Sequence, residues 1–153
     1  MVYTFTAEAL NRIRKQLTTE IKNQIDSKKL NATGRLRNSV KGTVFASSKS
    51  ISLNIYAAEY FESVDKGTKP GNKPPYSKIA EWVYRKGLNP YNKKTSKLRM
   101  IKSIQEAILE KGTIERFGYK GADILKFIDK SYADQITEEV KKGYLKDLES
   151  QIN

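Results

Sequence analysis

The sequence predicts an α+β fold with a long N-terminal helix, an antiparallel β-hairpin or small sheet, and several C-terminal helices packed on one face. Three observations predict it. A helical apolar stripe runs through residues 6–26, apolar and polar residues alternate within 40–58, and helical periodicity returns from residue 76. Strands that precede a run of helices, instead of alternating with helices, are typical of the α+β class.

Length and composition limit the possible classes of protein. The 153 residues predict a single domain, 1–153, with a basic Pro/Gly-containing loop-helix-loop insertion at about 66–97. No apolar run reaches the roughly 18 residues of a membrane span, and the N-terminus lacks the pattern of a signal peptide, so we expect a cytoplasmic protein. The chain has no cysteine and no histidine, which excludes disulfides, thiolate nucleophiles and Cys/His zinc sites.

The first predicted element is an amphipathic helix of about five turns that ends near Asp26. Thr6 is the expected N-cap, because a hydroxyl side chain there accepts a bond from a free backbone amide of the first turn. Residues 31–34 contain a glycine and break the helix. The apolar stripe consists of Leu10, Ile13, Leu17, Ile21 and Ile25.

Two predicted strands follow, at Val40–Ser47 and Ser50–Ala58, with a short polar turn between them. Apolar residues alternate with polar ones in the second strand, as in a sheet with one buried face. Two strands alone are marginally stable. We therefore expect further strands near residues 59–64 or 113–117, or strands contributed by a neighbouring subunit.

Helices are predicted for the rest of the chain. Tyr76–Lys86 is a short helix with Trp82 expected in the core, and Lys97–Lys111 is a longer one. A glycine directly follows each of these helices and is expected to end it. Residues 122–128 are predicted helical, and this helix either continues or restarts at Ala133.

Most of the net charge lies between Lys66 and Lys102. This stretch has eleven basic residues against one acid, Glu81, and contributes +10 of the formal charge of +12. Such a concentration fits a nucleic-acid backbone or an acidic protein surface, and solvated loops without a partner are the alternative. The predicted assembly or DNA-facing basic loops contain Lys66, Lys69, Lys73, Lys78, Arg85, Lys86, Lys93, Lys94, Lys97 and Arg99.

Carboxylates offer the only route to an enzyme in this sequence. A magnesium-dependent nuclease needs two or three converging carboxylates. Two acidic groups lie close in sequence, Glu59, Glu62 and Asp65, and Glu106, Glu110 and Glu115. No phosphate-binding loop is present, and we expect no catalytic residues, no metal, no cofactor and no enzymatic activity.

Three segments carry a family resemblance, and the last of them, Ile104–Thr113, precedes a C-terminal helix. Ala32–Val40 follows the long helix and opens the hairpin, and Tyr56–Glu62 is followed closely by Lys66-Gly67-Thr68. In order and spacing, these segments resemble the small head–tail connector, or tail-completion, proteins of tailed bacteriophages, which typically show a TGxLRxS turn and a YAxYxExGT segment. The resemblance covers roughly residues 6–130. The matching residues are Thr33, Gly34, Arg35, Leu36, Arg37, Ser39, Tyr56, Ala57, Tyr60, Glu62, Gly67 and Thr68.

The resemblance implies a structural virion protein of the phage neck without catalytic activity. Such a connector, tail-completion or terminator ring joins the portal or capsid to the tail around the DNA channel, and is assembled in the host cytoplasm. The implied partners are copies of itself in a ring, portal, connector or tail proteins, and double-stranded DNA bound without sequence specificity, but no membrane. The alternative function is a non-specific nucleic-acid-binding module, which shares the basic stretch but does not require a ring.

Overall fold

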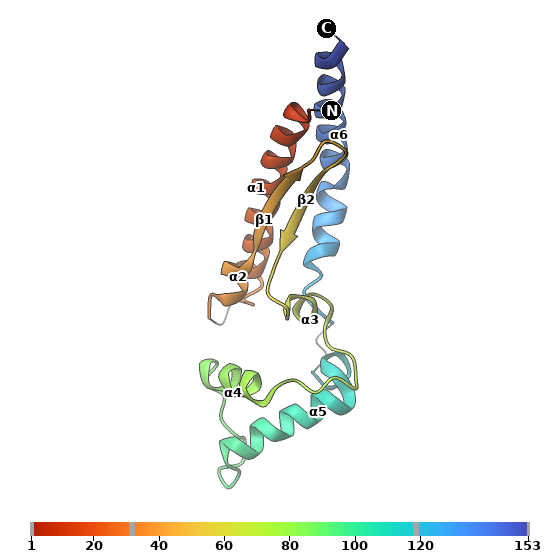
Figure 1. Cartoon of the computed structure of the whole chain (residues 1–153). Coiled ribbons are helices and arrows are strands. Elements are labelled where there is room, and N and C mark those ends of the chain that lie inside the picture. The colour runs from red at the N-terminus through yellow and green to blue at the C-terminus, as the bar shows by residue number, and fades with distance from the viewer. Residues whose placement is uncertain (1, 31–32, 118–119, 153) are drawn as a thin grey trace. The chain divides into compact units, whose positions relative to one another are not determined.

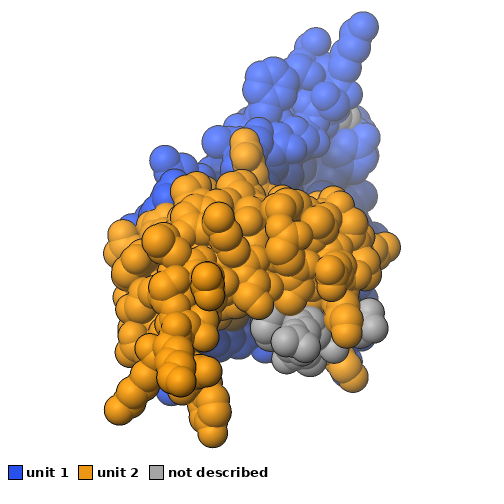
Figure 2. Space-filling view, turned by 90° about the horizontal axis from the view of Figure 1, so that it is seen from below, with its two compact units in different colours: residues 1–29, 35–58, 124–153 blue, residues 30–34, 59–123 orange. Residues whose placement is uncertain are grey.

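The computed structural model has the predicted α+β class, with helices and one antiparallel hairpin in the described residues 2–30, 33–117 and 120–152 (Figure 1). The chain divides into two compact units, shown in different colours in Figure 2. Unit 1 comprises residues 1–29, 35–58 and 124–153, and unit 2 comprises residues 30–34 and 59–123. The stretch predicted as an insertion, at about 66–97, lies within unit 2.

Unit 1 is organised around α1 (Thr4–Ser27), which contacts both the hairpin and α6 (Ile124–Ile152) (Figure 1). The predicted apolar stripe of α1 is confirmed, because all five of its members are buried. Leu10, Ile13 and Leu17 form the centre of this core. The residues that pack against them are Val44, Ile51, Leu53 and Ile55 of the hairpin and Ile128, Tyr132, Ile136 and Val140 of α6.

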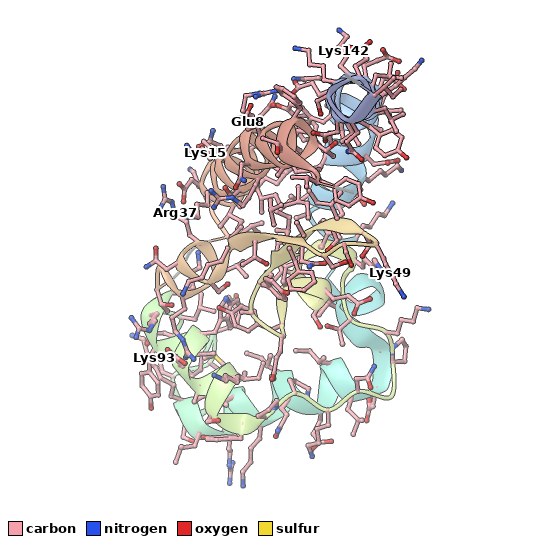
Figure 3. All side chains as sticks on the ribbon, turned by 45° about the horizontal axis from the view of Figure 1, so that its top comes forward. Glu8, Lys15, Arg37, Lys49, Lys93 and Lys142 are labelled. Atoms are coloured by element: carbon pink, nitrogen blue, oxygen red, sulfur yellow. The ribbon has the colours of Figure 1, made fainter. Side chains whose placement is uncertain are left out.

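The hairpin joins β1 (Lys41–Ala46) to β2 (Ile51–Tyr56) in antiparallel register, with Val44 opposite Leu53. The predicted polar turn is confirmed: the backbone amide of Ser47 donates to the carbonyl oxygen of Ser50 at 2.8 Å. Lys49 lies at this turn (Figure 3). The alternation in β2 is also confirmed, because its apolar residues are half-buried and its polar ones are exposed.

The two additional predicted strands are wrong. The described residues form one two-stranded sheet, residues 61–66 form helix α3 (Phe61–Lys66), and residues 113–117 belong to α5 (Lys97–Phe117). Phe61 and Val64 are both half-buried and are three residues apart, which places them on the same side of a helix. An ion pair of 3.1 Å between Glu62 and Lys66, four residues apart, adds to the helical preference of this segment.

Helix α1 begins differently from the prediction. It starts at Thr4, so Thr6 lies in its first turn and is not the N-cap. The hydroxyl of Thr6 is buried and donates to Asp147 Oδ2 of α6 at 2.6 Å. The two residues are 141 positions apart, so no local pattern could indicate the contact.

The C-terminal helix passes very close to the start of α1. Gly143 of α6 is buried, and a Cβ atom at this position would lie 2.9 Å from the carbonyl oxygen of Phe5. Helix α6 is continuous through Ala133, which decides between the two predicted alternatives. Its last residues run past the first turn of α1, where the Gln151 side chain donates to the carbonyl oxygen of Val2 at 3.5 Å.

Unit 2 contains α3, α4 (Tyr76–Arg85) and α5, and α4 packs against α5. Residues 67–75 have no regular structure, as predicted, but the segment is attached to α5. The amide of Gly71 donates to the carbonyl oxygen of Leu109 at 2.7 Å, and the side chain of Gln105 donates to the carbonyl oxygen of Pro74 at 2.7 Å. The segment therefore has a defined course along the helix.

Gly112 interrupts α5 as predicted, with a φ of 65° and a ψ of −170°. The kink brings Thr113 to Thr68, and the two residues exchange hydrogen bonds. The amide of Thr113 donates to the carbonyl oxygen of Thr68 at 2.9 Å, and the amide of Thr68 donates to Thr113 Oγ1 at 2.8 Å. Two Lys-Gly-Thr tripeptides, at 66–68 and 111–113, are thereby joined.

Candidate functional site

The strongest concentration of charge lies where α4 is connected to α5, and we call residues 82–102 the basic tip. Lys93 marks this end of unit 2 in Figure 3. The basic tip has seven Lys/Arg residues and no Asp or Glu. The first turn of α5 also lacks an acid, so no carboxylate there neutralises the positive end of the helix dipole.

The basic tip begins at a well-defined end of α4. The amide of Gly87 donates to the carbonyl oxygen of Tyr84 at 3.1 Å, and the amide of Leu88 donates to that of Val83 at 3.0 Å. This pair of bonds is the Schellman pattern, and Gly87 supplies the positive φ, 63°, that the pattern requires. The prediction that a glycine ends this helix is confirmed.

The loop that follows is held by its own polar groups. Asn92 Oδ1 accepts a hydrogen bond from the amide of Lys94 at 2.9 Å, and its carbonyl oxygen accepts one from the amide of Thr95 at 2.9 Å. Ser96 then caps α5, because its Oγ accepts a bond from the amide of Arg99 at 3.2 Å. The backbone of the loop is therefore folded without help from a partner.

The aromatic residues of the basic tip are largely outside the core. Trp82 was predicted to be a core residue, but this is wrong, because 43% of it is exposed. Val83 takes the fully buried position on α4, and Trp82 is turned by about 100° around the helix from it. Tyr84 and Tyr91 are exposed as well, and Lys97 Nζ lies 5.1 Å from the centre of the Tyr84 ring.

Some of the predicted basic residues are already engaged by acids of unit 2. Lys66 pairs with Glu62, Lys73 with Glu106, and Arg85 with Glu81 at 3.3 Å. These pairs are exposed, and pairs of this kind contribute about 0–1 kcal/mol. Their main effect is to lower the local positive charge around Lys66, Lys73 and Arg85.

The other predicted basic residues are not neutralised. In the described part of the chain, no ion pair or hydrogen bond involves the side chains of Lys69, Lys78, Lys86, Lys93, Lys94 and Arg99. Lys78, Arg85, Lys97 and Arg99 lie on helices, as the predicted helices imply, and Lys66 is the one predicted loop residue that the structure places on a helix. Lys66 is the last residue of α3.

A second candidate surface is the open face of the hairpin, defined by the outward residues of both strands. Phe45 is 64% exposed and Tyr56 is 55% exposed on this face, whereas the opposite face packs on α1. The remaining members are Lys41, Thr43, Ser52 and Asn54. In the described residues, neither strand has a hydrogen-bonded neighbour beyond the other.

The residues of the family-like motifs connect elements. In unit 1, Ser39 Oγ accepts a hydrogen bond from the amide of Ala58 at 2.9 Å and donates to the carbonyl oxygen of Leu36 at 2.6 Å. These contacts tie α2 (Arg35–Ser39) to the end of β2. Arg37 Nε also pairs with Asp26 Oδ2 at 2.7 Å, which links α2 to α1.

The motif residues of unit 2 have the same kind of role. Gly34 has a φ of 78° and Gly67 a φ of 76°, so both occupy turns that disfavour a side chain. Thr68 is bonded to Thr113, as described above, and the carbonyl oxygen of Tyr60 accepts the amide of Val64 at 3.2 Å. In unit 1, Leu36 and Val40 are both buried, directly before the hairpin begins at Lys41.

The acidic groups do not form a site in the described part of the chain, where no three acidic side chains are placed to share a metal ion. Glu59 and Glu62 are exposed while Asp65 is buried. The side chain of Glu115 lies outside the described residues. No helix among the described residues has the length and apolar character needed to cross a membrane.

The contacts of three structurally important residues were not identified from the sequence. Asp147 and Thr113 act through distant partners, although the repeat of Lys-Gly-Thr was a visible signal for Thr113. Asn92 lies in a polar loop, where such residues favour local turns.

Comparisons of the chain with protein-family models, with curated proteins and with solved structures find no match.

Proposed function

We propose that this chain is a structural protein of the neck of a tailed bacteriophage. Copies of it form a ring around the DNA channel and join the portal or capsid to the tail, as a head–tail connector, tail-completion or terminator protein. The observation that carries the proposal is the open hairpin of unit 1. The order and spacing of the family-like motifs give the proposal its biological setting.

The hairpin is suited to pairing with another copy. A two-stranded sheet is marginal by itself, and exposed edge strands offer unpaired backbone groups to another chain. Here α1 covers one face, and the other face exposes Phe45 and Tyr56. Exposed aromatic residues of this kind are enriched in protein–protein interfaces.

The edges also suggest the symmetry of the assembly. The β1 edge and the β2 edge of one hairpin are different surfaces. If β1 of one copy contacts β2 of the next, the contact is head-to-tail, and repetition of a head-to-tail contact produces a ring when the rotation closes.

The motif residues support a structural function. Ser39 joins α2 to the end of β2, and Thr68 joins the loop after α3 to the kink of α5. Hydrogen bonds between elements of a scaffold are what a subunit needs in order to present the same surface in every copy. Residues arranged for a reaction would instead converge on a substrate.

A double variant of the open face tests the proposal. We expect Phe45→Ser/Tyr56→Ser to reduce self-association, measured by sedimentation velocity over a range of concentrations. Because both side chains are exposed in one copy, the melting temperature of the isolated subunit should change little. Loss of association in the variant supports the proposal, and equal association of wild type and variant contradicts it.

Val44→Ser is the matched control, because Val44 is next to Phe45 but faces α1. This variant should destabilise unit 1 through the loss of buried apolar surface. The double variant should leave stability unchanged while it removes association. The comparison distinguishes an interface from a part of the core.

A further inference from the structure

We infer that the basic tip binds nucleic acid through the phosphate backbone without reading the sequence, and that Tyr91 adds contacts with unpaired bases. The inference goes beyond the proposed ring and does not depend on it, since the basic tip lies within unit 2. The supporting observations are an acid-free concentration of charge, a preformed loop and exposed aromatic side chains.

Four cations of the basic tip are available. In the described part of the chain, the side chains of Lys86, Lys93, Lys94 and Lys102 are exposed and form no ion pair or hydrogen bond. Like charges placed close together repel one another and destabilise the fold. A polyanion removes this repulsion and releases its own counterions on binding.

The loop is organised before any partner arrives. Gly87, Asn92 and Ser96 satisfy the backbone groups of the turn, the loop and the start of α5. A preformed surface loses less conformational entropy on binding than a flexible one. The bond that Asn92 accepts comes from the backbone amide of Lys94, so it leaves the Lys94 side chain free for a partner.

The composition of the basic tip favours nucleic acid over an acidic protein. Lysine is depleted in protein–protein interfaces, whereas protein–DNA interfaces are strongly positive. Five of the seven cations here are lysines. Trp82, Tyr84 and Tyr91 are exposed among them, and aromatic side chains next to cations are the usual platform for single strands.

Fluorescence anisotropy with labelled 20-nucleotide single strands and 20-base-pair duplexes of mixed sequence tests the inference. Wild type should bind both, with affinity that falls steeply as salt rises and does not depend on base sequence. The variant Lys86→Gln/Lys93→Gln/Lys94→Gln should bind both about tenfold or more weakly at low salt, with a shallower salt dependence.

The matched control removes the same charge from unit 1. Lys130→Gln/Lys141→Gln/Lys142→Gln changes three exposed lysines of α6, and Lys142 is visible in Figure 3. This variant should bind with less than a twofold change. Equal losses in the two triple variants would show that only net charge matters, and would overturn the inference.

Two further measurements separate the partners. Tyr91→Ala should weaken binding of the single strand about fivefold or more and leave duplex binding nearly unchanged, because only unpaired bases can stack on the ring. A poly-glutamate chain of matched charge that binds as tightly as DNA would identify an acidic protein as the partner and overturn the inference. Sedimentation of the same samples shows whether the ring is intact, so failure of the ring proposal is recognised separately.

Discussion

At the residue scale, the carboxylate of Asp147 determines where α1 begins. Asp147 is fully buried on α6, and its two oxygens accept the amides of Phe5 and Thr6 at 2.8 and 2.9 Å. The first amides of a helix have no partner within that helix, so a carboxylate from elsewhere both satisfies them and interacts favourably with the helix dipole. One residue thus joins the two ends of the chain.

The ionisation of Asp147 follows from this environment. Burial raises the pKa of the carboxyl, but the hydrogen bonds from the Thr6 hydroxyl and from the amides of Thr6, Phe5 and Thr4 together outweigh burial. The net effect lowers the pKa of Asp147 below the ordinary value of 3.8. The charged form therefore stabilises the folded state.

Replacing this carboxylate tests the capping role. We expect Asp147→Asn to lower the free energy of unfolding by about 1–3 kcal/mol at neutral pH, because buried amides lose a charged acceptor. The depressed pKa means that the wild-type stabilisation is complete above an unfolded-state pKa of about 3.9 and is lost as the pH falls from there through the folded pKa.

The measurement is urea unfolding at several pH values. The difference in the free energy of unfolding between wild type and Asp147→Asn should shrink as the pH falls below about 4. Asp134→Asn is the control, since Asp134 is exposed on the same helix. A constant difference between wild type and Asp147→Asn across this pH range would contradict the capping role.

Two glycines with nearly the same backbone angle give a second residue-scale prediction. Gly112 and Gly87 have φ values of 65° and 63°, but a Cβ at Gly112 would lie 2.2 Å from the carbonyl oxygen of Thr68, and a Cβ at Gly87 would meet nothing within 4 Å. Gly87→Ala should cost about 1–2 kcal/mol from backbone strain alone. Gly112→Ala should cost several kcal/mol more, because overpacking and strain add.

Thermal unfolding of the two alanine variants measures this difference. Gly87→Ala should give a cooperative transition at a modestly lower temperature. Gly112→Ala should lose the cooperative transition of unit 2 or shift it much further. Equal shifts in the two variants would mean that the contact between Thr68 and Thr113 does not constrain the kink.

At the element scale, the local patterns were sufficient for α1, α4, α5, α6 and the hairpin, but not for the short helices α2 and α3. The stripe of α1 and the alternation in β2 lie inside the elements that they predict, and the glycines after α4 and within α5 lie where these helices end or kink. The wrong predictions concern properties that a local pattern does not determine, namely whether a short segment is a helix or a strand and which apolar residue is buried. Residues 61–66 have spacing compatible with a short helix, and Trp82 has the apolar character of a core residue but not the position of one.

The candidate surfaces were predictable to different degrees. The charge of the basic tip is a property of composition, and the sequence indicated it directly. The order of its loop depends on Asn92 and Ser96, whose hydrogen bonds could only be found in the structure. The hydrogen bonds between Thr68 and Thr113 join residues 45 positions apart, which no periodic pattern relates.

The loop after α3 offers an element-scale prediction. Gln105 is part-buried and donates to the carbonyl oxygen of Pro74, so Gln105→Ala should lower the free energy of unfolding of unit 2 by about 1 kcal/mol. Ser103→Ala is the control, because Ser103 is exposed on the same helix. Urea unfolding that gives the same midpoint for both variants would show that this hydrogen bond does not hold the loop.

At the scale of the whole molecule, the two units are proposed to have different tasks. The open hairpin of unit 1 is proposed to contact other copies, and the basic tip of unit 2 is proposed to contact nucleic acid. The two tasks predict independent defects. Phe45→Ser/Tyr56→Ser should lose association and keep DNA binding per subunit, whereas the triple lysine variant of the basic tip should keep association.

Native mass spectrometry of the purified wild-type chain tests the central claim most directly. A ring built by head-to-tail contacts predicts one dominant closed species with a single copy number. On dilution, this closed species should persist longer than smaller intermediates. A chain that remains a monomer at every soluble concentration, or that forms an open-ended series of sizes, would contradict the ring.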